Sequence, residues 1–311
     1  MNNFDKLIGQ EAVKRQLAFH LAGHKARGRS PFLLLLGAKG LGKTTFAKAY
    51  GKELKDTYKP ENGGELEFVE LNCSAFKNLE SFLAAFKEGI EHRNTIVLLD
   101  EVHCLKEDLT NAFLTIFNPK KESKSEFWWE EMLYEFDFMQ QTFIFATTES
   151  DKIFPPLRDR MTPIGFELYS QEELGQIIAT SLPNISITED TLELMATTVR
   201  DNARQAIKLS EYIESYCATW QIDYFDMECF NDLSYHIDIL PYGISRIEQK
   251  ALEILNNGDC TLTALAAKLG LSKTAVQRDH ELYLLSKDFI EIDGKRRITR
   301  KGRELLAQTQ T

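Results

Sequence analysis

The sequence predicts an α/β domain with a parallel sheet, followed by a small all-helical domain and a terminal domain of short helices with two strands. Continuous apolar runs such as "PFLLLLG" and "NTIVLLD" alternate with helical stretches through residues 1–168. From 169 to 240 apolar residues recur at helical spacing, with no strand pattern. After Pro241 and Gly243, three short helices and two brief strands around an Asp-Gly turn follow. We therefore expect domains at 1–168, 169–240 and 241–311.

Length and composition are those of a globular chain. Its 311 residues are enough for two or three domains, each with its own core. No apolar run approaches the roughly 20 residues of a membrane span, and the N-terminus lacks a basic-then-apolar leader pattern. The five cysteines are scattered and form no Cys-x-x-Cys pair, which disfavours a disulfide framework and a zinc site. We expect a cytoplasmic protein with no membrane partner.

Charge is distributed unevenly along the chain. The formal net charge is −10, which alone argues against a nucleic-acid partner. Residues 242–311, however, carry 12 Lys and Arg against 9 Asp and Glu, and "GKRRITRKGR" concentrates six of these cations. Because phosphate binding needs clustered cations rather than a positive total, the basic C-terminal end is a candidate DNA-binding surface.

A phosphate-binding motif follows the first apolar run. The stretch "LLLLGAKGLGKTT" matches G-x-x-x-x-G-K-[ST] at Gly37, Gly42, Lys43 and Thr44, between an expected strand and an expected helix. In this setting the glycines let backbone N–H groups surround phosphate and the helix N-terminus favours negative charge. Lys43 would reach the terminal phosphates, and the Thr44 hydroxyl would bind Mg²⁺.

Carboxylates and hydroxyls end two later strands. Asp100 closes the buried run "NTIVLLD", where an ionised carboxylate is costly unless it holds a cation such as Mg²⁺. Glu101 beside it could polarise an attacking water. The run "TFIFATTES" places Thr147 and Thr148 at the end of another strand, where a hydroxyl could lie between the carboxylates and the γ-phosphate. These features predict an ATP and Mg²⁺ site at one edge of the sheet.

Five motifs occur in a family-specific order. They are "IGQEAVKRQL", "GLGKTT", "DEVH", "ATT" and "PLRDR", followed by "RDNARQAIKL" and by "ELYLLSKDFIEIDGKRRITRKG" near the C-terminus. Over essentially the whole chain, this set resembles the RuvB family of AAA+ ATPases, bacterial motors of Holliday-junction branch migration. The resemblance implies an AAA+ P-loop domain with a parallel sheet, an α-helical lid and a C-terminal winged-helix DNA-binding domain.

The resemblance also implies roles for individual residues. Lys43, Asp100 and Glu101 would bind and hydrolyse ATP, with Mg²⁺ held by Thr44 and Asp100. Thr148 would be the first sensor. Two arginines would complete the site: Arg204 from the lid, and Arg160 acting on the neighbouring subunit's nucleotide, with Arg158 as the second choice.

Further contacts are implied on the same basis. Beside Lys43, Thr44 and Arg204, the nucleotide contacts would be Ile8, Gly37, Gly40, Gly42, Thr45 and Tyr169. The wing cations that touch DNA would be Lys295, Arg296, Arg297 and Arg300. The chain departs from the family where "GAKG" replaces Gly-Pro-Pro-Gly and where Glu149 replaces an arginine after the two threonines. We therefore expect a divergent relative.

The function implied is an ATP-driven DNA motor. A ring, most simply a hexamer, would hydrolyse ATP between subunits and translocate duplex DNA or drive branch migration. Two alternatives stay open. A clamp-loader-like or protein-remodelling AAA+ ATPase would use its winged helix to dock a protein, and a nucleotide-controlled DNA-binding switch would turn ATP over slowly. Glu101 argues against the switch, which needs no water-polarising carboxylate.

An aromatic segment lies between the Asp100–Glu101 pair and the two threonines. In "SEFWWEEMLYEFDF", alternation places Tyr134, Phe136 and Phe138 on one face, so 133–138 is predicted to be a half-buried return strand. The adjacent Trp128 and Trp129 point to opposite sides, so at most one can face the core. In the family, a hairpin here contacts an adaptor protein. We expect the 120–138 segment to form a hairpin that could bind a partner, not necessarily RuvA-like.

Overall fold

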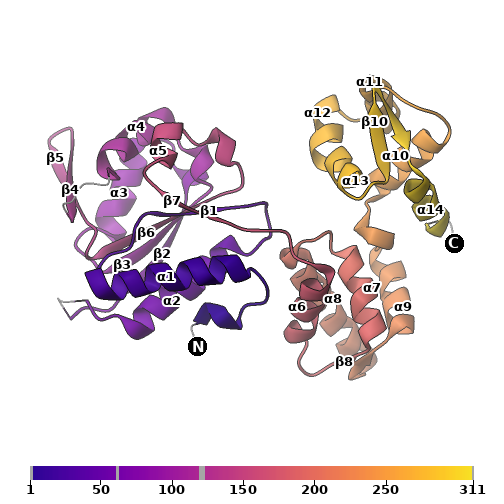
Figure 1. Ribbon diagram of the computed structural model, residues 1–311, viewed down its shortest axis with the longest axis horizontal. Helices are drawn as coiled ribbons and strands as arrows, with labels where there is room; N and C mark the ends of the chain where they lie inside the picture. Colours follow the sequence, from indigo (N-terminus) through magenta and orange to yellow (C-terminus); the bar gives the residue numbers. More distant parts are fainter. Residues whose placement is uncertain (1–2, 61–62, 119–122, 310–311) are drawn as a thin grey trace. The chain divides into compact units, whose positions relative to one another are not determined.

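The computed structural model describes residues 3–60, 63–118 and 123–309 (Figure 1). The chain folds into two compact units. Unit 1 comprises Met1–Glu173 with Asn202–Arg204, and unit 2 comprises Leu174–Asp201 with Gln205–Thr311. The division into three domains stays a prediction. In the described part of the chain, no helix combines the length and apolar character needed to cross a bilayer.

Unit 1 is built on a five-stranded parallel sheet. Its strands, in spatial order, are β2 (Glu67–Asn72), β3 (Thr95–Asp100), β6 (Gln141–Thr147), β1 (Leu33–Leu36) and β7 (Thr162–Gly165). Every pairing is parallel, so the carboxyl ends of β1, β3 and β6 meet at one edge. The expected parallel sheet is thereby confirmed, and it brings the three motif-bearing strand ends together.

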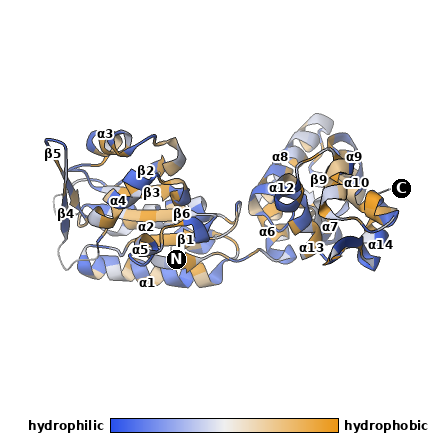
Figure 2. Ribbon diagram, turned by 90° about the horizontal axis from the view of Figure 1, so that it is seen from above, coloured by the Kyte–Doolittle hydropathy of each residue, from blue (hydrophilic) through white to orange (hydrophobic). Residues whose placement is uncertain are grey.

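Helices cover both faces of this sheet. Helices α1 (Glu11–Arg27) and α2 (Lys43–Thr57) lie on one face, and α3 (Leu79–Gly89) and α4 (Glu107–Ile116) lie on the other (Figure 1). The shorter helices of unit 1 are η1 (Asn3–Lys6), η2 (Cys73–Ala75), η3 (Val102–Cys104), η4 (Ser150–Lys152) and α5 (Pro155–Arg158). Apolar strands between more polar helices are visible in Figure 2 and explain the continuous apolar runs in the sequence.

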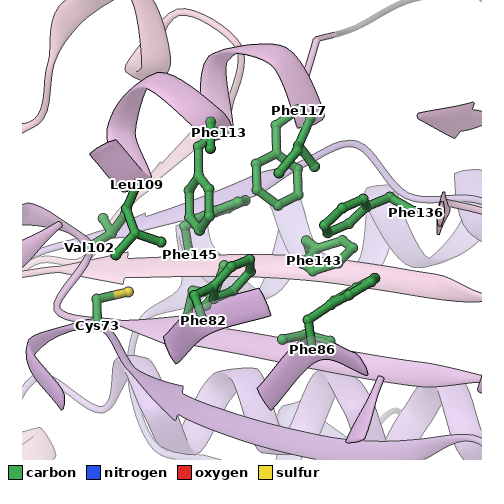
Figure 3. Close-up of a cluster of buried hydrophobic side chains, with 14 of the residues drawn as sticks. Cys73, Phe82, Phe86, Val102, Leu109, Phe113, Phe117, Phe136, Phe143 and Phe145 are labelled. Carbon is green, nitrogen blue, oxygen red and sulfur yellow. The ribbon is translucent and has the colours of Figure 1, made fainter. Parts of the chain in front are cut away.

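A cluster of phenylalanines fills the space between the sheet and helices α3 and α4. Phe82 and Phe86 of α3 and Phe113 of α4 point toward Phe143 and Phe145 of β6 (Figure 3). The ring centroids of Phe82 and Phe113 are 4.9 Å apart in an edge-on arrangement, which adds to the burial of apolar area. This packing anchors β6 and therefore fixes the positions of the residues that follow it.

The strand β7 was not anticipated from the sequence. It contains Pro163, which has no backbone N–H to donate, and a proline argues against a strand when only the sequence is read. In the structure β7 is the edge strand and pairs only with β1, where Pro163 lies opposite Leu34. An edge position tolerates proline because one side of the strand has no neighbour.

The aromatic segment forms the expected hairpin beside α3 and α4. Its strands are β4 (Lys124–Trp129) and β5 (Met132–Asp137), paired antiparallel across Glu130 and Glu131; residues 120–122 lie outside the described part. As predicted, the three aromatic residues of the return segment are buried: Tyr134, Phe136 and Phe138. Trp129 packs against the phenylalanine cluster, whereas Trp128 is 65% exposed. Only one tryptophan faces the core, as alternation required.

The first half of unit 2 is a helical bundle. Its helices are α7 (Glu189–Thr198), α9 (Met227–Ile237) and all but the first residues of α6 (Gln171–Ser181) and α8 (Ala203–Trp220). Two short strands, β8 (Ser186–Ile187) and β9 (Tyr224–Phe225), pair in parallel between the helices. The sequence showed no strand pattern here because two residues are too few to display alternation.

The second half of unit 2 is a winged-helix domain with its own core. It contains η5 (Pro241–Gly243), α10 (Arg246–Asn256), α11 (Leu262–Leu269), α12 (Lys273–Ala275), the π-helical η6 (Val276–Glu281), α13 (Leu282–Ser286), β10 (Ile290–Asp293), β11 (Lys295–Ile298) and α14 (Arg300–Gln308). The two strands turn at Gly294, whose φ is 67°, and form the predicted wing. Helix α14 was not predicted; Leu305 and Leu306 attach it to this core.

A buried ion pair links the two halves of unit 2. Glu248 of α10 is fully buried and accepts two hydrogen bonds from the guanidinium of Arg200, at 2.9 and 3.0 Å. That guanidinium lies 3.8 Å from the ring centroid of Tyr283, a cation–π contact. The next residue, Asp201, pairs with Lys287 at 2.6 Å. Arg200 and Asp201 both have φ of 54°, so this turn is held in a left-handed conformation by its partners.

Candidate functional site

The phosphate loop connects β1 to α2 in unit 1. Helix α2 begins at Lys43, directly after Gly42, whose φ of 90° lies in the left-handed region that glycine adopts freely. Gly40 has a φ of 86°, and a Cβ on it would lie 2.0 Å from Oδ1 of Asn202. The glycines therefore allow a tight loop in front of a helix N-terminus, the arrangement that binds phosphate.

Lys43 lies folded into this loop. Its Nζ donates to the carbonyl oxygens of Gly37 at 2.7 Å and Ala38 at 3.0 Å, and the residue is 7% exposed. Burial lowers the pKa of Lys43, the carboxylates of Asp100 and Glu101 act in the opposite direction, and Arg204 lowers it further. An anion at the loop would stabilise the charged amine, so the site fits a phosphate group.

Oxygen ligands suited to a divalent cation meet beside Lys43. The Thr44 hydroxyl lies 3.4 Å from Oδ2 of Asp100, and Oδ1 of Asp100 accepts from the backbone N–H of Glu101 at 2.8 Å. Mg²⁺ prefers such hard oxygen ligands and is held by few protein groups when phosphates supply the rest. The two residues predicted to bind Mg²⁺ thus lie together, and their chemistry fits that ion.

Glu101 is held in an uncommon backbone conformation. Its φ is 54° and ψ 45°, a left-handed geometry that costs energy for a non-glycine residue and often marks functional sites. Its Oε2 accepts a hydrogen bond from the Thr148 hydroxyl at 3.3 Å. The structure therefore brings the predicted water-polarising carboxylate and the predicted sensor hydroxyl into contact across the ends of β3 and β6.

One neighbour of Glu101, His103, was given no role from the sequence. His103, in η3, places Nδ1 2.9 Å from the Thr147 hydroxyl and 3.3 Å from Oε2 of Glu101. Its Nε2 lies 3.3 Å from Oε1 of Glu149. The signal available was the histidine in "DEVH", but two of its partners are distant along the chain: Thr147 ends β6 and Glu149 follows it.

Asn202 and Arg204, around the start of α8, belong to unit 1 together with the phosphate loop. The Asn202 side chain donates to the Lys39 carbonyl at 3.1 Å, while its Oδ1 accepts from the backbone N–H of Arg204 at 2.9 Å. Arg204 is exposed, and its charge acts on Lys43. The charge of the predicted second-sensor arginine therefore lowers the pKa of the P-loop lysine.

Tyr169, one of the predicted nucleotide contacts, also touches the phosphate loop. Tyr169 is buried and donates its hydroxyl to the Leu41 carbonyl at 3.1 Å; burial raises its pKa to about 12, so it stays neutral. Gly9, which follows Ile8, lies against the Tyr169 ring, where a Cβ would come within 3.0 Å. Gly9 and Tyr169 are thus neighbours, whereas no contact tests the roles of Ile8 and Thr45.

The two candidate trans-acting arginines differ in their surroundings. Arg158 ends α5 and is exposed. Arg160 is half-buried, its guanidinium donates to the Pro156 carbonyl, and its Nε has no hydrogen-bond partner in the described part of the chain.

The wing cations are not equivalent. Arg296 donates two hydrogen bonds to Glu281, at 2.7 and 3.1 Å, and its side chain is 11% exposed. Arg297 pairs with Asp259 at 2.9 Å. Lys295 is exposed at the turn, and Arg300 is 93% exposed and pairs with the exposed Glu304 at 2.8 Å. Sequence clustering could not separate these roles, because the acidic partners of Arg296 and Arg297 lie on other elements.

Comparisons with known proteins agree with this arrangement. Residues 33–167 match the family AAA, ATPase family associated with various cellular activities, and residues 241–307 match the RuvB C-terminal winged helix domain. The chain is 28% identical to the Holliday junction branch migration complex subunit RuvB of Thermotoga petrophila, covering 93% of this chain and 85% of that protein. The RuvB of Thermotoga maritima is likewise 28% identical, over 95% and 88%.

Solved structures give the same result. A single-residue variant of Thermotoga maritima RuvB superposes with a TM-score of 0.77 at 25% identity, covering 98% of this chain and 97% of that one. A second variant of the same protein gives 0.76 at 25% identity, over 98% and 96%. The similarity therefore spans the ATPase unit, the helical bundle and the winged helix.

Proposed function

Since the chain is a RuvB-like AAA+ ATPase, we propose that it uses ATP hydrolysis to drive branch migration or translocation of duplex DNA. The observation that carries this proposal is the union, in one chain, of an ATPase site with a winged helix matched to RuvB. The protein-remodelling alternative is not favoured, because the relatives reported above, similar along nearly the full length, are branch-migration subunits. We place this activity in the cytoplasm, where the five free cysteines would stay reduced.

The proposed chemistry assigns a separate task to each group. Lys43 would exchange its contacts with loop carbonyls for phosphate oxygens, and Arg204 would add a second positive charge. Thr44 and Asp100 would hold Mg²⁺, which neutralises charge on the phosphates when bound. Glu101 would accept the proton of the attacking water, and the Thr148 hydroxyl would report the state of the γ-phosphate to Glu101.

We further propose that the chain works as a ring, most simply a hexamer, with Arg160 acting in trans. Mixing Arg160→Ala subunits with Glu101→Gln subunits, each nearly inactive alone, should then restore ATPase activity, because a Glu101→Gln subunit supplies its arginine to the intact site of an Arg160→Ala neighbour. An arginine supplied in trans is worth about 10³–10⁵ in rate. Activity is measured across the mixing ratio. Mixtures no more active than the separate variants would contradict the trans role, and Arg158→Ala tested in parallel identifies which arginine acts.

For DNA, we propose that the exposed wing cations contact the phosphate backbone. Lys295 and Arg300 are the best placed, while Arg296 is held by buried Glu281 and Arg297 by Asp259. Replacing Lys295 and Arg300 by Ala should weaken binding to all duplex sequences alike and reduce the salt slope by about 1 per lost contact. Binding is titrated at several salt concentrations. Lys250→Ala, an exposed cation on α10 of the same domain, is the control; an equal loss there would point to bulk charge instead.

The β4–β5 hairpin is our candidate for a partner or adaptor surface. It exposes Trp128, Leu133 and Met132 at 65%, 41% and 38%, and an exposed tryptophan of this kind is typical of an interface anchor. A partner of this kind would bind at the hairpin without altering the ATP site. If the chain alone migrated junctions at the rate seen with any added partner, the adaptor proposal would fail.

The decisive experiment is a branch-migration assay. Four-way junctions with homologous arms, forks and linear duplexes are incubated with the purified chain and ATP. We expect ATP-dependent conversion of junctions into duplex products, and no conversion with a non-hydrolysable analogue. ATPase activity that responds to a protein partner but to none of these DNA substrates would refute the proposal.

A further inference from the structure

An imidazole lies between two carboxylates at the edge where β3 and β6 end. Nδ1 of His103 is 3.3 Å from Oε2 of Glu101, and Nε2 is 3.3 Å from Oε1 of Glu149. The His103 side chain is 10% exposed, so solvent competes little for these contacts. One ring therefore connects the carboxylate proposed to polarise water with a carboxylate to which no role has been given.

The surroundings hold this ring in place. The buried Thr147 hydroxyl lies 2.9 Å from Nδ1 and also accepts from the backbone N–H of Glu149 at 3.0 Å. The second oxygen of Glu149 is paired with Lys152. Both Glu149 and Thr147 are thus fixed by other groups, so they can orient the imidazole instead of following it.

The geometry has a chemical consequence for Glu101. A carboxylate only accepts hydrogen bonds, so an N–H on the ring can donate to the carboxylate beside it, and such charge-assisted bonds are stronger than neutral ones. Oε2 of Glu101 lies 3.3 Å from both Nδ1 of His103 and the Thr148 hydroxyl. Oε1 takes part in neither contact. It is the oxygen available for a water molecule.

We propose that His103 is a positioning residue for ATP hydrolysis: it holds Oε2 of Glu101 while Glu149 orients the ring. Its task is to restrict a flexible glutamate to the orientation in which Oε1 faces the attacking water. Misplacing a catalytic group by about 1 Å can cost 10²-fold in rate. The proposal rests on the ATPase activity and not on DNA translocation. A chain that hydrolyses ATP without migrating junctions would refute the motor and leave this proposal testable.

Two near-isosteric substitutions separate the two nitrogens. The amide of Asn reaches where Nδ1 lies, and the amide of Gln reaches where Nε2 lies. His103→Asn should keep the contact with Glu101 and retain kcat within about threefold, whereas His103→Gln and His103→Ala should lower kcat by about 10–100-fold. KM for ATP and the Kd of a fluorescent ADP analogue should change less than about threefold in all three, because none of these atoms binds nucleotide.

A double-mutant cycle tests whether Glu149 acts on Glu101 through the imidazole of His103. Glu149→Ala should lower kcat in the wild-type background, and it should add nothing to His103→Ala if Glu149 acts only through the imidazole. His236→Ala, an exposed histidine on α9, serves as the matched control and should leave kcat unchanged. Thermal melting identifies any variant that fails to fold, in which case the Asn and Gln variants decide.

Three results would overturn the proposal. One is a wild-type kcat in His103→Ala. Another is a His103→Gln variant more active than His103→Asn. The third is a parallel loss of ADP-analogue affinity and kcat in folded protein, since that would indicate a role in shaping the nucleotide site as a whole.

Discussion

Replacing Glu101 by Gln is expected to lower kcat for ATP by about 10²–10⁴, the usual contribution of a positioned general base. The amide keeps the size of the side chain and can still accept from the Thr148 hydroxyl, but it cannot take a proton from water. Nucleotide affinity should persist, because the groups proposed to bind phosphate, Lys43 and Thr44, are untouched. Single-turnover hydrolysis and binding of a fluorescent ATP analogue measure the two quantities separately.

The control for this variant is Glu107→Gln, an exposed glutamate at the start of α4. It removes the same charge close by in the sequence and should leave kcat unchanged. Retention of more than about a tenth of the wild-type kcat by Glu101→Gln would show that another group accepts the proton.

Replacing Glu248 by Ala is expected to destabilise unit 2 by about 3–5 kcal/mol, the cost of removing one member of a buried ion pair. The carboxylate receives two bonds from Arg200, and it also accepts from the backbone N–H of Ser245 at 2.7 Å, closing the capping box of α10. Its loss therefore removes the carboxylate acceptor of the Arg200 guanidinium and of the Ser245 backbone N–H.

Urea unfolding, monitored by the fluorescence of Trp220, measures this loss of stability. The background carries Trp128→Phe and Trp129→Phe, so that the signal reports unit 2 alone, because the chain has three tryptophans. Glu304→Ala is the matched control, since it removes the exposed pair with Arg300 and should leave the midpoint unchanged. Equal shifts in both variants would mean that the buried pair contributes no more than a surface pair.

The fold was predictable where local pattern and motif agree. Strands β1, β3 and β6 were recognised because they are buried on both faces and read as continuous apolar runs. Strand β7 and the β8–β9 pair were missed, the first because of Pro163 and the second because of its length. The long helices of the bundle were predicted from the helical spacing of their apolar residues, whereas α14 was not predicted.

The candidate site shows the same division. The P-loop, Asp100 and Glu101 were found because their chemistry depends on residues adjacent in sequence. His103 was overlooked, since its partner Glu149 follows a different strand and is brought near only by the pairing of β3 with β6. Arg296 was taken as a DNA contact with its neighbours, although the structure pairs it with buried Glu281.

By itself, the sequence determined the parallel α/β unit, the phosphate loop with its acidic pair, the hairpin and the basic wing. Each depends on periodicity, on a turn or on a motif within a few residues, and such features act through the local backbone. Only the tertiary structure decided which charges are paired: Arg200 with Glu248, Arg296 with Glu281, and His103 between Glu101 and Glu149. The reason is physical, because the free energy of a charged side chain depends on the partners and burial that folding supplies from distant segments.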